Sequence, residues 1–127
     1  MREIVFSKNA PQPIGPYSQA VKVGNTVYYS GQIGLDPTTG LFTSDSDVVV
    51  QTKQVMSNIK ALLDASGMTF ENIVKSSIFL KDMNDFPAVN TEYASYFKSN
   101  YPARETVEVS RLPKDALVEI SIICVAD

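Results

Sequence analysis

Few residues of this chain are suited to catalysis, because the sequence contains no histidine and only one cysteine, Cys124. Histidine is the most common general base and zinc ligand, and it activates serine and cysteine nucleophiles. A single cysteine also excludes an intrachain disulfide and a multi-cysteine metal site. Any chemistry is therefore expected to depend on carboxylates, arginine, hydroxyl groups, backbone groups and water.

Two charged residues stand out by their position. Glu119 lies within the apolar stretch 117–126, where an ionised carboxylate is costly unless it is paired or hydrogen-bonded. An acid exposed at a strand edge and a functional acid near a cleft are both consistent with this pattern.

Arg104 follows Pro102 and Ala103 at the expected start of a strand. Its planar guanidinium matches a carboxylate with two parallel hydrogen bonds, and an ordinary surface ion pair is the alternative.

Other candidates carry weaker signals. Gly31 permits either a bulge or the close approach of a ligand. Tyr17 ends a proline-rich segment, and its ring is expected either to close over a pocket or to pin that segment to the core. Ser30, Asn90 and Thr106 are uninformative when each is taken alone.

The sequence contains five strand-like segments and two segments whose apolar residues have the spacing of a helix. Residues 19–23 and 26–30 flank Gly24-Asn25 and predict a hairpin. Further strands are expected at 73–80, 105–109 and 117–125.

The first helical stripe begins near residue 47, and Asp45 or Ser46 is expected to cap it, with Gly67 at its end. The second stripe runs from Phe86 to Phe97, with Pro87 in its first turn. The resulting order ββαβαββ predicts a single α+β domain, residues 1–127, with both helices on one face of a mixed sheet.

Both faces of the last predicted strand are largely apolar. Residues 118, 120, 122 and 124 alternate with residues 117, 119, 121, 123 and 125. Because two helices cover only one side of a sheet, the other side is expected to meet another copy of the chain.

Composition narrows the class of protein. The 127 residues are 44% hydrophobic and 20% charged, which is typical of one folded domain. The net charge is −3 and the basic residues are scattered, which disfavours nucleic-acid binding. The chain shows neither a secretory leader nor a membrane-spanning stretch, so a cytoplasmic protein is expected.

Three segments carry a family resemblance: NAPQPIGPYSQAV (9–21), YYSGQIGLDPTTG (28–40) and YPARETVEVSRLPKDALVEI (101–120). Together with IVKSSIFLKDMNDFPAVNTEY (73–93), they resemble the RidA (YjgF) family of reactive intermediate deaminases nearly end to end. The resemblance implies a chorismate-mutase-like fold assembled as a homotrimer, with active sites between subunits. It also implies cofactor-free hydrolysis of 2-aminoacrylate, 2-iminobutanoate and 2-iminopropanoate to 2-oxo acids and ammonia, which limits damage to pyridoxal-phosphate enzymes.

The resemblance also assigns roles to residues. The carboxylate-binding arginine of the family falls on Arg104 and its water-positioning glutamate on Glu119. Its substrate-binding positions fall on Tyr17, Ser30, Gly31, Asn90 and Thr106. Many bacterial members carry a cysteine where this chain has Thr106, so thiol chemistry is excluded at that position while a backbone role remains.

Two other functions remain open at this stage. Domains of this fold that lack the arginine act as non-catalytic small-carboxylate-binding or regulatory modules, and Arg104 argues against that reading. An endoribonuclease or translation inhibitor is the other reading. The absence of histidine and of a basic patch argues against it.

Overall fold

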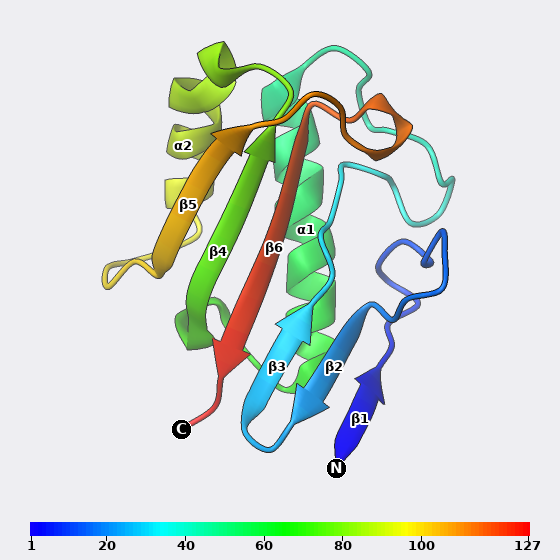
Figure 1. The fold of residues 1–127 in the computed structure, drawn as a ribbon, viewed down its shortest axis with the longest axis vertical. Helices are drawn as coiled ribbons and strands as arrows, with labels where there is room; N and C mark the ends of the chain where they lie inside the picture. Colours follow the sequence, from blue (N-terminus) through cyan, green and yellow to red (C-terminus); the bar gives the residue numbers. More distant parts are fainter.

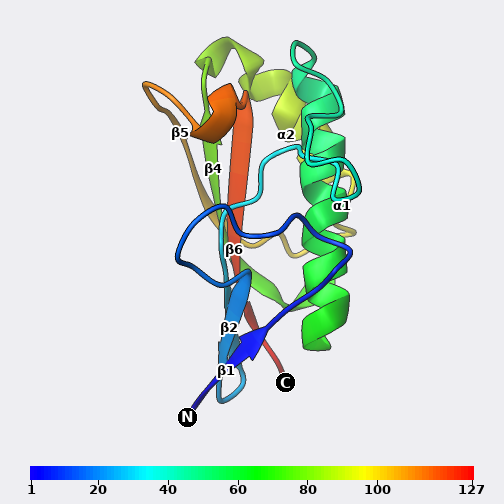
Figure 2. The same cartoon turned by 90° about the vertical axis from the view of Figure 1, so that its right-hand side faces the viewer.

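Two helices cover one face of a six-stranded mixed sheet in the computed structural model, which describes residues 1–127 (Figures 1 and 2). The sheet has the order β1-β2-β3-β6-β4-β5. All neighbouring strands are antiparallel except β4 and β5. The strands are β1 (Arg2–Val5), β2 (Ala20–Val23), β3 (Thr26–Tyr29), β4 (Ile73–Leu80), β5 (Ala103–Glu108) and β6 (Val118–Val125). Seen along its edge, the sheet has no α-helix on its second face (Figure 2).

The structure adds one strand to the predicted order. β1 pairs with β2 at the edge of the sheet, so the order of elements is βββαβαββ. The predicted hairpin is confirmed as β2 and β3, and Gly24 in its turn has a left-handed φ of 60°. Three short 3₁₀ turns complete the chain: η1 (Phe70–Asn72), η2 (Met83–Asp85) and η3 (Pro113–Asp115). None of the helices is long and apolar enough to span a membrane.

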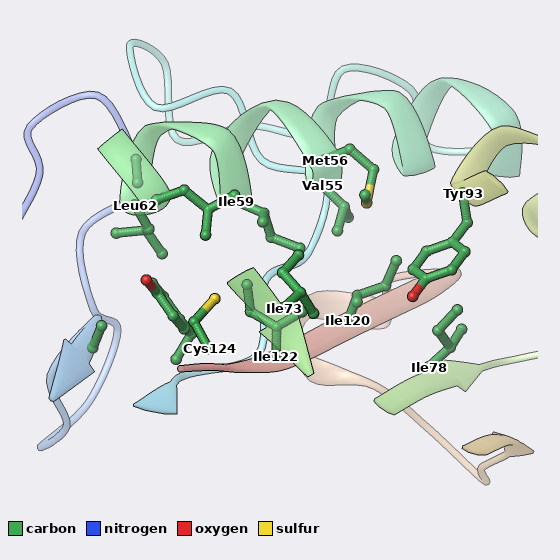
Figure 3. Close-up of a cluster of buried hydrophobic side chains, with 14 of the residues drawn as sticks. Val55, Met56, Ile59, Leu62, Ile73, Ile78, Tyr93, Ile120, Ile122 and Cys124 are labelled. Atoms are coloured by element: carbon green, nitrogen blue, oxygen red, sulfur yellow. The ribbon is translucent and has the colours of Figure 1, made fainter. Parts of the chain in front are cut away.

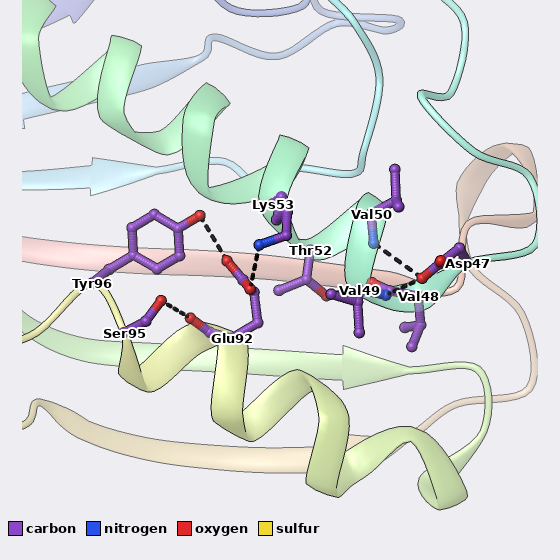
Figure 4. A network of polar contacts seen from close by, with 9 residues as sticks. All are labelled: Asp47, Val48, Val49, Val50, Thr52, Lys53, Glu92, Ser95 and Tyr96. Carbon is purple, nitrogen blue, oxygen red and sulfur yellow. Dashed lines mark hydrogen bonds and ion pairs between the residues drawn. The ribbon is translucent and has the colours of Figure 1, made fainter.

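The N-cap of helix α1 (Val48–Ser66) lies one or two residues after the two expected caps. Asp47 is the N-cap, with extended backbone, and its carboxylate accepts hydrogen bonds from the amides of Val49 and Val50 (Figure 4). The prediction of Asp45 or Ser46 was therefore wrong. The helix ends at Gly67 as predicted, in the left-handed conformation with φ of 73°.

Helix α2 (Phe86–Ala94) carries Pro87 in its first turn, as predicted. It ends before Phe97, whose ring still packs 4.9 Å from the Tyr93 ring. An ion pair between Lys53 and Glu92 joins the two helices, with 2.9 Å between Nζ and Oε1 (Figure 4).

The core lies between α1 and the sheet (Figure 3). The buried side chains of β6 are those of alternate residues, Val118, Ile120, Ile122 and Cys124, so the predicted alternation is confirmed. They face the apolar stripe of α1, which includes Val55, Met56, Ile59, Leu62 and Leu63. The intervening residues of β6 are half-buried on the opposite face, where no helix covers them.

Candidate active site

Arg104 lies on β5, the strand at one edge of the sheet. It stands opposite Ser76 of β4, and its side chain turns toward α2, where its Cζ lies 5.1 Å from the centre of the Tyr93 ring and 5.7 Å from that of Phe86. Stacking on two aromatic faces is favourable for a guanidinium. None of the four ion pairs of the chain involves Arg104. The alternative of an ordinary surface ion pair is therefore wrong, and the cation is left without a carboxylate partner.

A groove surrounds this guanidinium, lined by Asn90, Tyr93, Ala94, Tyr101, Pro102 and Arg104. The structure thus brings Asn90 of α2 beside Arg104. Tyr93 is fixed beneath them because its hydroxyl donates to the Ser76 hydroxyl across 2.8 Å. Burial raises the pKa of Tyr93, and the Ser76 hydrogen bond and the charge of Arg104 oppose that shift. The tyrosine is a neutral support for the cation.

Thr106 follows two residues after Arg104 on the same side of β5, opposite Ile78. Its Oγ1 is the one buried side-chain nitrogen or oxygen atom that has no hydrogen-bond partner. Buried hydroxyl groups are nearly always paired. The unpaired Thr106 hydroxyl is thus an unused donor on the same side of β5 as Arg104.

Glu119 lies on β6 with its side chain on the helix-free face, since its neighbours Val118 and Ile120 point into the core. It stands opposite Phe79 of β4 and is half-buried. Its carboxylate forms no ion pair, and burial raises its pKa. The alternative of an exposed acid at a strand edge is wrong, because β6 is an inner strand.

Gly31 faces this carboxylate at very close range. A Cβ at position 31 would lie 2.7 Å from Glu119 Oε2 and 2.8 Å from Cδ. The segment is held there by a backbone bridge, in which Gln32 N donates to Ile120 O (2.8 Å) and Ile120 N to Gln32 O (3.1 Å). A close approach therefore requires glycine at position 31, but the approaching group is the carboxylate of Glu119, and a ligand contact at Gly31 stays a prediction.

A small pocket of about 50 Å³ opens beside Glu119 and Gly31, with Tyr17 at its rim. The Tyr17 hydroxyl accepts a hydrogen bond from Ile14 N (3.2 Å), which leaves its own proton free to donate. Ser30 lies next to Gly31, but its hydroxyl donates to Ser18 O across 2.6 Å. Ser30 can therefore only accept a hydrogen bond from a ligand.

The predicted residues thus form two groups on opposite faces of the sheet. Arg104, Asn90 and Thr106 lie on the α2 side of β5, whereas Glu119, Gly31 and Tyr17 lie at the pocket on the other face. Strand β4 separates β5 from β6. Within one chain, Arg104 and Glu119 therefore do not face a common cavity. No group of three or more His, Cys, Asp or Glu residues is placed to hold a metal ion.

Comparison with known proteins identifies the family of this chain. A family model described as "Endoribonuclease L-PSP" matches residues 7–126. The chain belongs to the endoribonuclease L-PSP family. It is 56% identical to a RutC family protein of Sulfurisphaera tokodaii, with 96% of this chain and 97% of the relative covered.

Two further matches connect the endoribonuclease L-PSP family to the resemblance found in the sequence. The chain is 47% identical to a 2-iminobutanoate/2-iminopropanoate deaminase of Dermatophagoides farinae, over 99% of this chain and 98% of the relative. It matches the crystal structure of YyfA of Yersinia pestis, a member of the conserved Rid protein family, with a TM-score of 0.96 and 47% identity, over 99% and 100% of the two chains. The predicted membership of the RidA family is confirmed.

Three buried glutamine and asparagine side chains that support the candidate site were not predicted from the sequence. Gln19 is 2% exposed, and its amide nitrogen donates to the carbonyls of Ser7 (3.0 Å) and Pro11 (3.0 Å), while its Oε1 accepts from Ser7 N (2.7 Å). Gln19 thereby fixes the proline-rich segment that carries Tyr17.

Helix α1 contributes two more buried amides. Gln51 donates to Ser44 O (2.8 Å) and accepts from Leu117 N (2.9 Å), and Asn58 donates to Leu35 O (2.9 Å). The available signal was their spacing, because residues 51, 55, 58 and 62 share one helical face. Polar residues within an apolar stripe indicate buried polar contacts.

Proposed function

We propose that this chain is a cofactor-free hydrolase that deaminates small 2-imino acids and their enamine tautomers, including 2-aminoacrylate, 2-iminobutanoate and 2-iminopropanoate. The observation that carries the proposal is the Arg104 guanidinium, which is stacked on two rings at the mouth of a groove and has no carboxylate partner. A cation held in this way is suited to a carboxylate ligand. The deaminase name of the Dermatophagoides farinae relative supports the same reaction.

In the proposed complex, the substrate carboxylate forms two parallel hydrogen bonds with Arg104. The unpaired Thr106 hydroxyl and the Asn90 amide supply further donors on that side. From the other side, Tyr17 donates its free proton and the Gly31 backbone borders the pocket, while the hydroxyl oxygen of the adjacent Ser30 can accept a hydrogen bond. These contacts orient the C=N bond toward Glu119, and orientation alone contributes strongly to rate.

The reaction needs no strong nucleophile. Water adds to the electrophilic C2 of the imine, so that a C–O bond forms, the C=N π bond breaks and the nitrogen gains a proton. A second proton transfer to nitrogen then lets the C–N bond break and the C=O bond form, releasing ammonia and the 2-oxo acid. An enamine substrate is first protonated at C3.

Glu119 orients the attacking water and accepts its proton. Because burial raises the pKa of this carboxyl, it is a stronger base than an exposed glutamate. The absence of any protein partner leaves both carboxylate oxygens free for water. The same carboxyl then returns the proton to the departing nitrogen.

We further propose that the site forms between copies of the chain in a homotrimer. Arg104 lies on an edge strand, and Glu119 lies on the face that no helix covers, so one copy's edge can approach the other copy's face. That face carries an apolar row across β1, β2, β3 and β6, formed by Ile4, Val21, Tyr28 and Ile123 in register. A row of this kind is typical of a surface that another chain covers.

The first test measures turnover. 2-Aminoacrylate is generated from serine by a dehydratase, and its decay is followed by absorbance with the native protein and with Arg104→Ala. We expect the native protein to accelerate the decay. Arg104→Ala should lose about 2 to 4 kcal/mol of transition-state stabilisation, a factor of tens to several hundred in rate. A native protein without effect would exclude the deaminase and leave a carboxylate-binding module.

The second test asks whether two copies share a site. Arg104→Ala and Glu119→Gln are each expected to be strongly impaired, and an equal mixture of the two is unfolded together and refolded. In a cyclic oligomer, about a quarter of the sites then combine an intact arginine with an intact glutamate from the neighbour, so activity should return to about that fraction. If the refolded mixture forms oligomers but stays inactive, Arg104 and Glu119 of different copies do not share a site.

The description of the family as an endoribonuclease suggests RNA as a substrate. The lack of histidine and the net charge of −3 favour the imino acid instead. A monomeric mass in light scattering at micromolar concentration would contradict the trimer, but it would not bear on the choice between RNA and an imino acid as the substrate.

A further inference from the structure

A buried amide of α1 holds the segment that faces Glu119. Asn58 is 1% exposed, and its Nδ2 donates to the carbonyl oxygens of Leu35 (2.9 Å) and Ile33 (3.2 Å). Only the nitrogen end of an amide can donate to two carbonyls, so these partners define the orientation of the side chain. Asn58 therefore connects α1 to residues that lie 23 and 25 positions earlier in the sequence.

The oxygen end of the same amide also has a partner. Gln54, one turn earlier in α1, donates from its Nε2 to Asn58 Oδ1 across 2.9 Å. Both hydrogens of the Asn58 nitrogen and one lone pair of its oxygen are thus used. A buried amide that is bonded at both ends is held in one orientation.

The two carbonyls depend on Asn58 to different degrees. Ile33 O also accepts from Leu35 N (2.8 Å), which closes a three-residue turn centred on Gly34. No backbone amide donates to Leu35 O, so Asn58 is its one donor. A buried carbonyl without a donor is costly. Loss of the Asn58 amide would therefore free the segment at Leu35.

The segment held by Asn58 forms one wall of the pocket beside Glu119. Ile33 and Leu35 line this pocket together with Gly31. Gly31 lies so close to the carboxylate that a Cβ at position 31 would be 2.7 Å from Glu119 Oε2. A movement of this wall therefore changes the space around the carboxylate directly.

A small hydrophobic cluster packs against the same segment. The side chains of Ile33 and Leu35 contact those of Leu112 and Ala116, separately from the main core. Apolar packing is not directional, whereas hydrogen bonds are. Asn58 is thus the side chain that sets the direction of the backbone at this wall.

We propose that Asn58 is a positioning residue for the hydrolysis: its amide holds residues 31–35 against Glu119, so that the carboxylate and the water it activates stay aligned with the substrate. This inference rests on the proposed function, since it assumes that Glu119 activates water. It adds a residue that acts through the backbone and lines neither the pocket nor the groove.

The same wall keeps the carboxyl partly desolvated. Tyr17 is the other titratable residue that lines the pocket, and burial alone raises the pKa of Glu119. If the wall loosens, water gains access to the carboxylate and the pKa of Glu119 should fall toward its ordinary value. A shift of this pKa is a readout that a general loss of stability does not predict.

The first experiment uses Asn58→Leu, which keeps the approximate size of the side chain and removes both donors. 2-Iminopropanoate is made in place from alanine by an L-amino-acid oxidase with catalase, and semicarbazide captures the imine that is not hydrolysed. We expect kcat to fall about tenfold because the acid and its water are misaligned. The acidic limb of kcat/KM should move to lower pH, while calorimetry should show native affinity for pyruvate, which reports on Arg104.

A milder variant covers the case in which Asn58→Leu does not fold. Gln54→Leu leaves Asn58 in place but removes the donor to its Oδ1, so the amide is less firmly oriented. Its kcat and its acidic limb should change in the same direction as those of Asn58→Leu, by smaller amounts. Native values of both quantities in Gln54→Leu and Asn58→Leu would overturn the inference.

Ser66→Ala is the matched control on the same helix. The buried Ser66 hydroxyl, at the other end of α1, donates to Leu62 O across 2.9 Å and bonds with the Tyr29 hydroxyl. Its removal should lower Tm without altering kcat or the pH profile. If Ser66→Ala and Asn58→Leu changed kcat and the pH profile equally, Asn58 would have only a structural role.

A titration separates this inference from the proposed function. The carboxyl carbon of Glu119 is followed by ¹³C NMR over pH, and its signal is identified by its absence in Glu119→Gln. The pKa of Glu119 should be lower in Asn58→Leu than in the native protein, and native in Ser66→Ala. This comparison holds even if the native protein hydrolyses no imine, a result that would exclude the deaminase. An unchanged pKa in Asn58→Leu would contradict the role of Asn58.

Discussion

The two halves of the candidate site are built in opposite ways. Arg104 rests on rings from α2, so its position depends on the packing of side chains against an edge strand. Glu119 instead rests on backbone. Gly31 lies so close to its carboxylate that a Cβ at position 31 would clash, and the bridge between Gln32 and Ile120 fixes this arrangement. The cationic half exposes its charge to a groove, whereas the acidic half confines its charge beside a small pocket.

This difference corresponds to the two tasks of the proposed reaction. Binding a carboxylate needs an accessible, oriented cation. Activating water needs a partly desolvated acid whose pKa is raised, which an open groove would not provide. Each half is chemically incomplete, so variants that affect one half should leave the other half measurable.

The largest expected effect comes from Glu119→Gln. The amide keeps the shape of the side chain but accepts no proton, so kcat should fall about 10²- to 10⁴-fold while pyruvate still binds at Arg104. In the native protein, kcat/KM should decline as the pH falls through the raised pKa of Glu119, and the variant should lack this limb. A variant with native kcat would remove the acid from the mechanism.

The same variant has a signature in stability. A carboxyl whose pKa is higher in the folded than in the unfolded protein stabilises the fold below its unfolded pKa, and this contribution is lost as the pH rises through the folded pKa. Glu119→Gln should therefore raise Tm at neutral pH and have a smaller effect near pH 4. A lower Tm at neutral pH would contradict the desolvation of the acid.

An intermediate effect is expected for Gly31→Ala. The new methyl group would lie 2.7 Å from Glu119 Oε2, so the flexible carboxylate must swing away from the pocket. A displacement of this size should lower kcat about 10- to 100-fold. Steady-state kinetics with 2-iminopropanoate measure this loss.

Gly24→Ala serves as the matched control for that substitution. Gly24 has a left-handed φ of 60° and open space around it, so alanine there strains the hairpin turn and should cost about 1 kcal/mol of stability without altering kcat. Equal kinetic losses for the two alanine variants would mean that Gly31 acts only through folding.

The smallest expected effect belongs to Thr106→Val. Removal of the unpaired hydroxyl should raise KM about two- to tenfold, the value of one hydrogen bond to substrate, and should leave Tm unchanged or higher because a buried unpaired group is lost. Thr106→Ser keeps the hydroxyl and should keep the native KM. A fall in Tm with native KM would instead indicate a structural hydroxyl.

Much of the fold could be predicted from local patterns. The alternation along β6 and the stripe of α1 correctly identified the core faces, because burial imposes a period on each element. β1 was missed because it is a four-residue edge strand, paired on one side only, with three exposed residues. The N-cap was misplaced by one or two residues, since Asp45, Ser46 and Asp47 are all suitable caps.

The residues of the candidate site could be selected from the sequence, but their division between two faces of the sheet could not. The facing directions of Arg104 and Glu119 depend on the registers of β5 and β6 against β4, with Arg104 opposite Ser76 and Glu119 opposite Phe79. Register is set by packing across strands that are distant in sequence. Whether Arg104 pairs with an acid of its own chain likewise depends on which side chains the fold brings near it.

The contact between Gln51 and the Leu117 amide couples the long helix to the strand of the acid. Sixty-six residues separate the two partners in sequence, and the amide lies just before Val118, where β6 begins. Opening of α1 at Gln51 would leave the Leu117 amide without this partner, whereas the Leu117 carbonyl would still accept from Lys81 N. Deuterium uptake at the Leu117 amide is therefore expected to report opening of the helix beside the strand that carries Glu119.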